Sequence, residues 1–179
     1  MAKVERIRDF RVKSGDCFFF DNNVWMFLFS PISGVNNMQQ RAYGNLLRSI
    51  QSAKATIFIN SLVVSEYINR SLKLNYSLWR DREFKSGNRF VDYKRDYRST
   101  EDFDNAQKEA YDEMSDILSI AHRKPDDFNA LKLDEVMNAK GMDFNDAYYA
   151  NFCKLNRLIL VTDDRDLQNS PLDITILTA

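Results

Sequence analysis

The stretch "CFFFDNNVW", residues 17–25, decides the fold, because an apolar run ends there abruptly in a carboxylate and two amides. Residues 17–20 are continuously apolar, as expected of a strand that is buried on both faces. Asp21, Asn22 and Asn23 follow as a polar loop, without the Gly or Pro of an ordinary turn. We therefore expect a buried strand whose end carries functional side chains.

The bulk composition favours one domain over residues 1–179. The chain is 44% hydrophobic and 28% charged, with a formal charge of −1, so whole-chain charge does not indicate a nucleic-acid partner. The N-terminus is polar and unlike a signal peptide, and the longest apolar run, Val24–Phe29, is too short to span a bilayer. We expect a soluble, cytoplasmic protein with no membrane partner.

Histidine and cysteine give no zinc-type spacing. Cys17 and Cys153 are far apart in apolar contexts, which favours two buried thiols over a disulfide or a metal pair. His122, the single histidine, is predicted to be structural or exposed.

Short apolar runs alternate with helical patterns along the whole chain. Strand-type runs are expected at 17–20, 55–60, 157–164 and 170–179. Helices are expected at 37–54, 61–79, 100–121, 126–141 (closed by Gly141) and 143–156. This alternation predicts an α/β fold with a parallel sheet covered by helices on both faces. Because crossovers are right-handed, the carboxyl ends of the strands gather at one edge, where sites form in such sheets.

Four acidic residues occupy equivalent places in this topology, at strand ends or helix starts. They are Asp21, Glu66, Asp146 and Asp164. Carboxylates held together repel one another unless a cation lies between them, and oxygen ligands suit Mg²⁺ or Mn²⁺. A carboxylate cluster with such an ion can activate water and stabilise charge on a phosphoryl group, which is phosphodiester hydrolysis.

Each acid also has a purely structural interpretation. A lone Asp at a strand end is usually a turn or cap residue, and a Glu early in a helix complements the dipole. Asp143 is predicted to be a cap, and of Asp163 and Asp166 one is expected to be merely solvated. The coincidence of four acids at four equivalent places favours the functional interpretation.

Four motifs in order resemble those of the PIN-domain nucleases, over residues 17–177. They are "FFFDNNVW", "SEYINR", "FNDAYYA" and "LVTDDRDL". The resemblance implies a three-layer α/β/α sandwich around a central parallel sheet. It implies that Asp21, Glu66, Asp146 and Asp164 are catalytic and bind Mg²⁺ or Mn²⁺. It also implies that three further residues support the site, namely Asn23, Thr162 and Asp166.

Residues 70–99 form a basic and aromatic insertion relative to compact family members. The segment has nine Lys or Arg against four acids, with six interleaved aromatics. Basic side chains that contact phosphates, together with aromatic rings that stack on bases, are typical of a surface that binds single-stranded nucleic acid. We expect this surface to lie beside the carboxylates. The candidate contacts are Arg80, Arg82, Lys94 and Arg95. The alternative is a helical extension with packed aromatics, whose charge pairs with the acidic segment 101–148.

Two functional hypotheses follow. The first is a metal-dependent endoribonuclease acting on single-stranded RNA. The resemblance implies that it is a toxin-type component with an inhibitory antitoxin, and that it forms a homodimer. The second is a non-catalytic PIN-like module that binds RNA or a protein partner. A phosphatase is disfavoured, because no convincing nucleophilic Asp and lysine loop is present.

Overall fold

A parallel sheet lies at the centre of the structure, a computed structural model that describes residues 1–30 and 37–179. Its strands run in the order β1-β6-β5-β2-β3-β4, and every neighbouring pair is parallel. Their bounds are Lys3–Arg6 (β1), Cys17–Phe20 (β2), Thr56–Ile59 (β3), His122–Arg123 (β4), Ile159–Val161 (β5) and Thr175–Thr178 (β6). The carboxyl ends of these strands therefore share one edge, as predicted.

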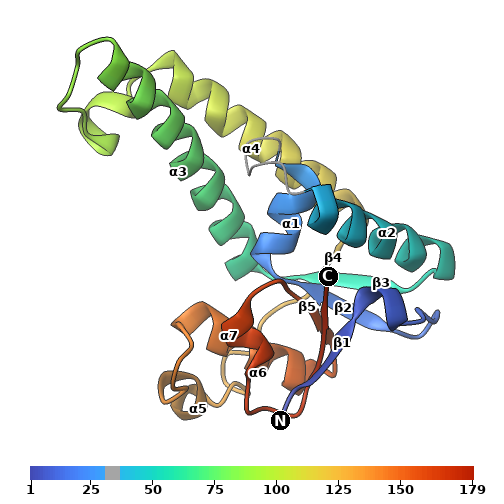
Figure 1. The fold of residues 1–179 in the computed structure, drawn as a ribbon. Helices are drawn as coiled ribbons and strands as arrows, with labels where there is room; N and C mark the ends of the chain where they lie inside the picture. The colour runs from blue at the N-terminus through green and yellow to red at the C-terminus, as the bar shows by residue number, and fades with distance from the viewer. Residues whose placement is uncertain (31–36) are drawn as a thin grey trace.

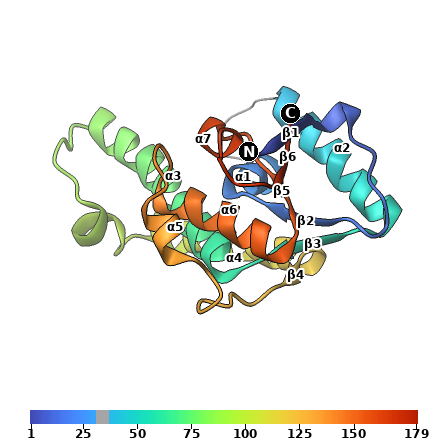
Figure 2. The ribbon, with the colours of Figure 1, turned by 90° about the horizontal axis from the view of Figure 1, so that it is seen from below.

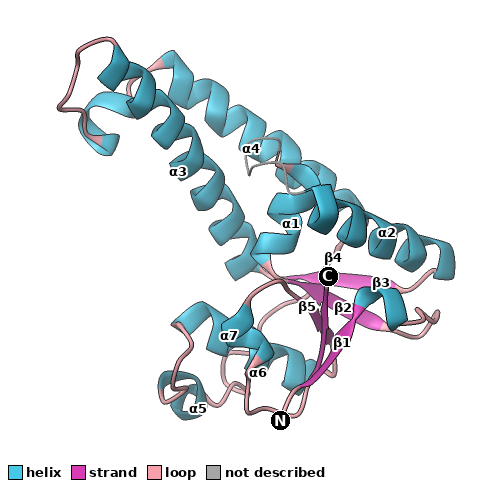
Figure 3. Cartoon of the chain, in the orientation of Figure 1, coloured by secondary structure: helices cyan, strands magenta, loops and turns pink. Residues whose placement is uncertain are grey.

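Helices cover both faces of the sheet (Figures 1 and 2). One face carries α1 (Asn22–Phe29), α2 (Asn37–Ala53), α3 (Ser61–Lys85) and α4 (Glu101–Ile120). The other carries α5 (Leu133–Met137), α6 (Phe144–Asn156) and α7 (Arg165–Gln168). Figure 3 shows the strands enclosed between these two helical layers, so the predicted three-layer α/β/α sandwich is confirmed. None of the helices over the described residues is long and apolar enough to cross a membrane.

The apolar run of β2 forms the centre of the core, because this strand lies between β5 and β3. Phe18, Phe19 and Phe20 are fully buried. The Phe19 ring packs at 5.2 Å from Phe152 of α6, and Phe20 packs at 5.0 Å from Trp25 of α1. Burial of such aromatic side chains on both faces explains why this strand is continuously apolar.

The expectation of a polar loop at residues 21–23 is wrong. Asp21 is the single residue between β2 and α1, which begins at Asn22. The backbone N–H of Asp21 donates to the Val161 carbonyl at 3.0 Å, and its carboxylate accepts the Asn22 N–H at 2.6 Å. Because this side chain caps α1, the chain turns from strand to helix without Gly or Pro.

Three further elements differ from the sequence expectation. Two edge strands, β1 and β4, carry charged residues and lack an apolar run, because an edge strand need not be buried on both faces. The helix expected over 126–141 is reduced to α5 and ends before Gly141. The Asp127 side chain accepts the Ala130 N–H at 3.3 Å, which favours a turn over a helix there.

The helices α3 and α4 form an antiparallel hairpin that projects away from the sheet (Figure 1). A second hydrophobic cluster, separate from the main core, holds its far end together. The buried members are Leu72, Trp79, Tyr97, Phe103 and Ala106. The connection includes a short π-helical turn, Tyr93–Tyr97 (η2).

Candidate functional site

The four predicted acids lie where helices begin at the carboxyl edge of the sheet. Asp21 follows β2 and caps α1, and Asp164 follows β5 and caps α7. Glu66 lies in the second turn of α3, which begins directly after β3. Asp146 lies in the first turn of α6. Figure 1 shows α1 and α3 starting side by side at this edge.

Asp21 is 5% exposed and is held by two donors. The Asn22 N–H donates to Oδ1 at 2.6 Å, and the Thr162 hydroxyl donates to Oδ2 at 2.7 Å. Burial, together with the charges of Glu66 and Asp164, raises the pKa of Asp21 to about 7, although the hydrogen bonds oppose this. The carboxylate is therefore fixed in position but electrostatically destabilised.

Glu66 is positioned by three side chains from two other helices. Its Oε2 accepts a hydrogen bond from the Tyr149 hydroxyl at 2.6 Å and from Asn145 Nδ2 at 3.3 Å. Its Oε1 lies 3.4 Å from Asn22 Nδ2. Burial and the charge of Glu66 raise the pKa of Tyr149, so this phenol remains a donor. The contacts connect α3 to α1 and α6 across the sheet edge.

Asp146 and Asp164 keep free carboxylate oxygens. Asp164 Oδ1 accepts the N–H groups of Asp166 and Leu167, whereas none of the described residues donates to Oδ2. Neither oxygen of Asp146 receives a hydrogen bond in the described part of the chain. The cap of α6 is Asp143, so the Asp146 carboxylate is not used for capping. Burial, followed by the charges of Asp143 and Asp21, raises the pKa of Asp146 to about 7.

None of the described residues gives these acids a basic partner. Each ion pair found over residues 1–30 and 37–179 involves other residues, and none includes Asp21, Glu66, Asp146 or Asp164. Besides burial, the charges of Glu66 and Asp164 raise the pKa of Asp21 and that of Asp146, so these carboxylates repel one another. A bound cation would remove this repulsion.

The chemistry of the donors fits a hard divalent cation, because all of them are oxygens. Asn22 Oδ1 adds a buried acceptor that has no partner among the described residues, next to Glu66. As the side chains stand, however, no group of three or more His, Cys, Asp or Glu in the described ranges is arranged to hold a metal ion. Binding would therefore require these side chains to rearrange, and Asp146 is the one whose carboxylate receives no hydrogen bond from the described residues.

The predicted supporting residues differ in their contacts. Thr162 Oγ1 lies 3.3 Å from Asn23 Nδ2 and accepts the Asp164 N–H at 2.9 Å, so Asn23 contacts the hydroxyl that donates to Asp21. Asn23 Oδ1 also accepts the Asp163 N–H at 3.3 Å. Asp166 is exposed, and only its backbone N–H contacts the site.

Sequence reasoning missed the residues that hold Glu66. Tyr149 lies three positions after Asp146, on the same face of a helix, and that spacing was a usable signal. Asn22 and Asn145 directly adjoin predicted acids in the sequence. Of Asp163 and Asp166, the exposed one is Asp166, whereas Asp163 accepts from Tyr43 at 3.1 Å and from Gln39 at 3.2 Å.

The predicted nucleic-acid contacts lie far along the α3–α4 hairpin. The expectation that they lie beside the carboxylates is therefore wrong. Arg80 is 14 residues beyond Glu66 on one helix, or about 21 Å at 1.5 Å per residue. Arg82 pairs with Asp102, and Arg95 with Asp96 at 2.7 Å. The helix is long because its far half packs against α4.

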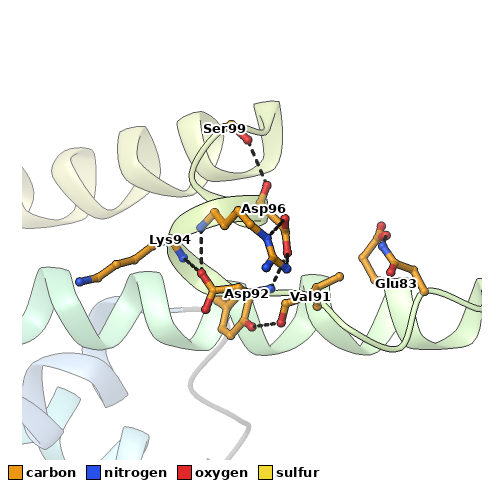
Figure 4. Close-up of polar contacts among 9 residues, drawn as sticks. Glu83, Val91, Asp92, Lys94, Asp96 and Ser99 are labelled. Carbon is orange, nitrogen blue, oxygen red and sulfur yellow. Dashed lines mark hydrogen bonds and ion pairs between the residues drawn. The ribbon is translucent and has the colours of Figure 1, made fainter.

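Hydrogen bonds also order the tip of this hairpin (Figure 4). Asp92 Oδ1 accepts the Lys94 N–H at 2.9 Å, and Asp96 Oδ2 accepts the Asp92 N–H at 2.7 Å. Most of the aromatics expected to stack on bases pack instead in the second hydrophobic cluster, at the far end of the hairpin (the tip cluster), whereas Phe84 and Phe90 are exposed. The tip thus resembles the packed extension more than an open stacking platform.

Comparison with known families matches residues 18–171 to the PIN domain. Because the match covers most of the chain, the chain belongs to the PIN-domain family, whose members are generally nucleases. A comparison with curated proteins yields no match. Among solved structures, the chain is similar to one in "Crystal structure of VapBC2 from Rickettsia felis bound to a DNA fragment from their promoter". The TM-score is 0.55 at 15% identity, over 90% of this chain and 98% of that chain, which shows a shared fold.

Proposed function

We propose that the protein is a divalent-metal-dependent endoribonuclease that hydrolyses phosphodiester bonds of single-stranded RNA. The observation that carries the proposal is a group of carboxylates that repel one another at the sheet edge and have no basic partner among the residues that the structure describes. Membership of the PIN-domain family supports the hydrolytic activity. We assign the catalytic and metal-binding roles to Asp21, Glu66, Asp146 and Asp164.

In this proposal the chain supplies three carboxylates that hydrogen bonds hold in place and a fourth, Asp146, that no described residue holds. Asp21 and Glu66 are oriented by Thr162 and Tyr149, and would hold Mg²⁺ or Mn²⁺ together with Asp146 and Asp164. The bound ion would activate a water and stabilise charge on the phosphoryl group. Asn23 would keep the Thr162 hydroxyl directed at Asp21, and Asp166 would support the same loop through its backbone.

Cleavage of a labelled single-stranded RNA with Mg²⁺, with Mn²⁺ and with EDTA tests the proposal. We expect cleavage that requires metal and is lost in Asp21→Asn and in Asp146→Asn. Asp112→Asn, which removes an equal charge from the exposed face of α4, is the matched control. Equal cleavage by wild type and Asp146→Asn would refute the assignment of these acids.

We further propose that the protein is a toxin-type component inhibited by an antitoxin. The similarity of fold to a chain of the VapBC2 structure supports this. The second candidate function, a non-catalytic module that binds RNA or a protein, is favoured by the incomplete arrangement for metal binding. RNA binding without metal-dependent cleavage would select it. Light scattering would test the proposed homodimer.

A further inference from the structure

A surface pocket of about 610 Å³ adjoins the candidate site and is lined by three arginines. Arg165 lies directly after Asp164 at the start of α7, and Arg6 and Arg8 come from the N-terminal segment. Gln39 of α2 and Asp163 also line the pocket. A pocket of this size falls within the range of small-ligand sites, about 300–1,000 Å³, and could contain a nucleotide.

The N-terminal strand brings two of these arginines to the same edge of the sheet as the carboxylates. β1 runs parallel to β6, with Arg6 opposite Thr178, so its carboxyl end lies at the same edge as Asp21. Arg8 follows in a short 3₁₀ helix, Ile7–Asp9 (η1), which contacts α2. The PIN-domain match begins at residue 18, so this segment is an addition to the matched region.

The charged side chains in the described lining of the pocket are three arginines and one aspartate, so their sum is positive. Asp163 is the sole acidic side chain in its described lining, and its oxygens already accept from Tyr43 and Gln39. Arg165 pairs with no carboxylate in the ranges that the structure describes. The Arg8 side chain is 84% exposed and makes a surface ion pair with Asp9 at 3.6 Å, and Arg6 donates one hydrogen bond to the Ala179 main-chain oxygen. Because a guanidinium group has five N–H donors, each of these groups keeps donors with which it can bind an anion.

We propose that this pocket binds phosphate groups of single-stranded RNA next to the bond that is cleaved. The inference rests on the proposed function and specifies where its substrate lies. Carboxylates repel phosphates, so a substrate that reaches Asp164 needs cations close by, and guanidinium groups bind phosphate oxygens in a fixed, forked geometry. The candidate contacts on the hairpin are too distant to supply them, since Arg80 already lies 14 residues, or about 21 Å, beyond Glu66 along α3.

The experiment measures binding of a fluorescein-labelled 12-nucleotide RNA of mixed sequence by anisotropy, over a salt series and in EDTA. The variant Arg6→Gln/Arg8→Gln should bind roughly 3- to 20-fold more weakly at low salt. The slope of log K against log salt should fall by about 1.4, or about 0.7 for each lost phosphate contact. Arg48→Gln/Lys108→Gln, which removes two charges from the exposed faces of α2 and α4, should leave both values unchanged.

Since Arg6 contacts the end of the chain, Arg8→Glu serves as a second variant that alters an exposed side chain only. Wild-type binding by both variants would overturn the proposal, as would an equal loss in the control variant. Competition by a polyglutamate peptide as strong as that by unlabelled RNA would assign the pocket to an acidic protein segment instead. The binding assay contains EDTA and does not depend on cleavage. A negative result in it is therefore distinguishable from a negative result in the cleavage assay that tests the proposed function.

Discussion

Removal of one charge at Asp146 should stabilise the metal-free protein at high pH. This carboxylate is half-buried, receives no hydrogen bond from the described residues and lies near the charges of Asp143 and Asp21. Its pKa rises from 3.8 to about 7 on folding. The folded protein therefore binds this proton more tightly than the unfolded chain does. As pH rises from about 4 to above 7, the ionised carboxylate progressively destabilises the fold.

The magnitude follows from the change in pKa. A difference of about three corresponds to roughly 4 kcal/mol, and partial exposure to water reduces this to about 1–2 kcal/mol. Asp146→Asn should thus raise the free energy of unfolding by about 1–2 kcal/mol at pH 8 and by little at pH 4. Urea unfolding in EDTA at both pH values measures it, with Asp112→Asn as the control that should not change the pH dependence.

Added metal should reverse this order. At 100 times its dissociation constant, Mg²⁺ should stabilise the wild type by about 2.7 kcal/mol and Asp146→Asn by clearly less. If Asp146→Asn is less stable than wild type at pH 8 in EDTA, Asp146 is a structural residue and the electrostatic argument is wrong. Equal stabilisation of both proteins by Mg²⁺ would likewise exclude Asp146 as a ligand.

Three further substitutions test other parts of the structure. Tyr149→Phe removes the 2.6 Å hydrogen bond to Glu66 and should reduce metal-dependent cleavage by about 10- to 100-fold, measured with the labelled RNA. Thr162→Val leaves Asp21 without its hydroxyl donor and should cost about 1–3 kcal/mol in urea unfolding, whereas Thr162→Ser should not. Trp79→Ala should cost about 3–5 kcal/mol by opening the tip cluster, yet leave the shift of melting temperature by Mg²⁺ unchanged.

The sheet was predictable from the sequence because its central strands are buried on both faces. The apolar runs of β2, β3 and β5 carry this signal directly, and they fix which edge holds Asp21 and Asp164. The edge strands β1 and β4 carry no such signal, since their polar residues face water. The pocket beside Arg6 was missed with them, because it depends on a strand that composition does not reveal.

The polar contacts of the site were less predictable than its acids. A strand end followed by a carboxylate has a topological position that can be deduced, as for Asp21. A hydrogen bond between Tyr149 and Glu66 joins residues 83 positions apart and depends on where α6 and α3, which lie on opposite faces of the sheet, approach each other at its edge. The length of the hairpin also could not be predicted from the sequence, because packing of its aromatic cluster extends α3 beyond the predicted end at residue 79.

The structural and catalytic interpretations of these acids are compatible, and the caps of the helices show why. Asp21 and Asp164 each cap a helix through Oδ1, so a cap role accounts for one oxygen and leaves the other for the site. Asp146 has no such role, because Asp143 already caps α6. An Asn at either capping position retains the cap and removes the charge, whereas an Ala removes both. Comparison of Asn and Ala variants at Asp21 therefore separates the cost in stability from the loss of cleavage: stability should fall mainly in Ala, and cleavage in both.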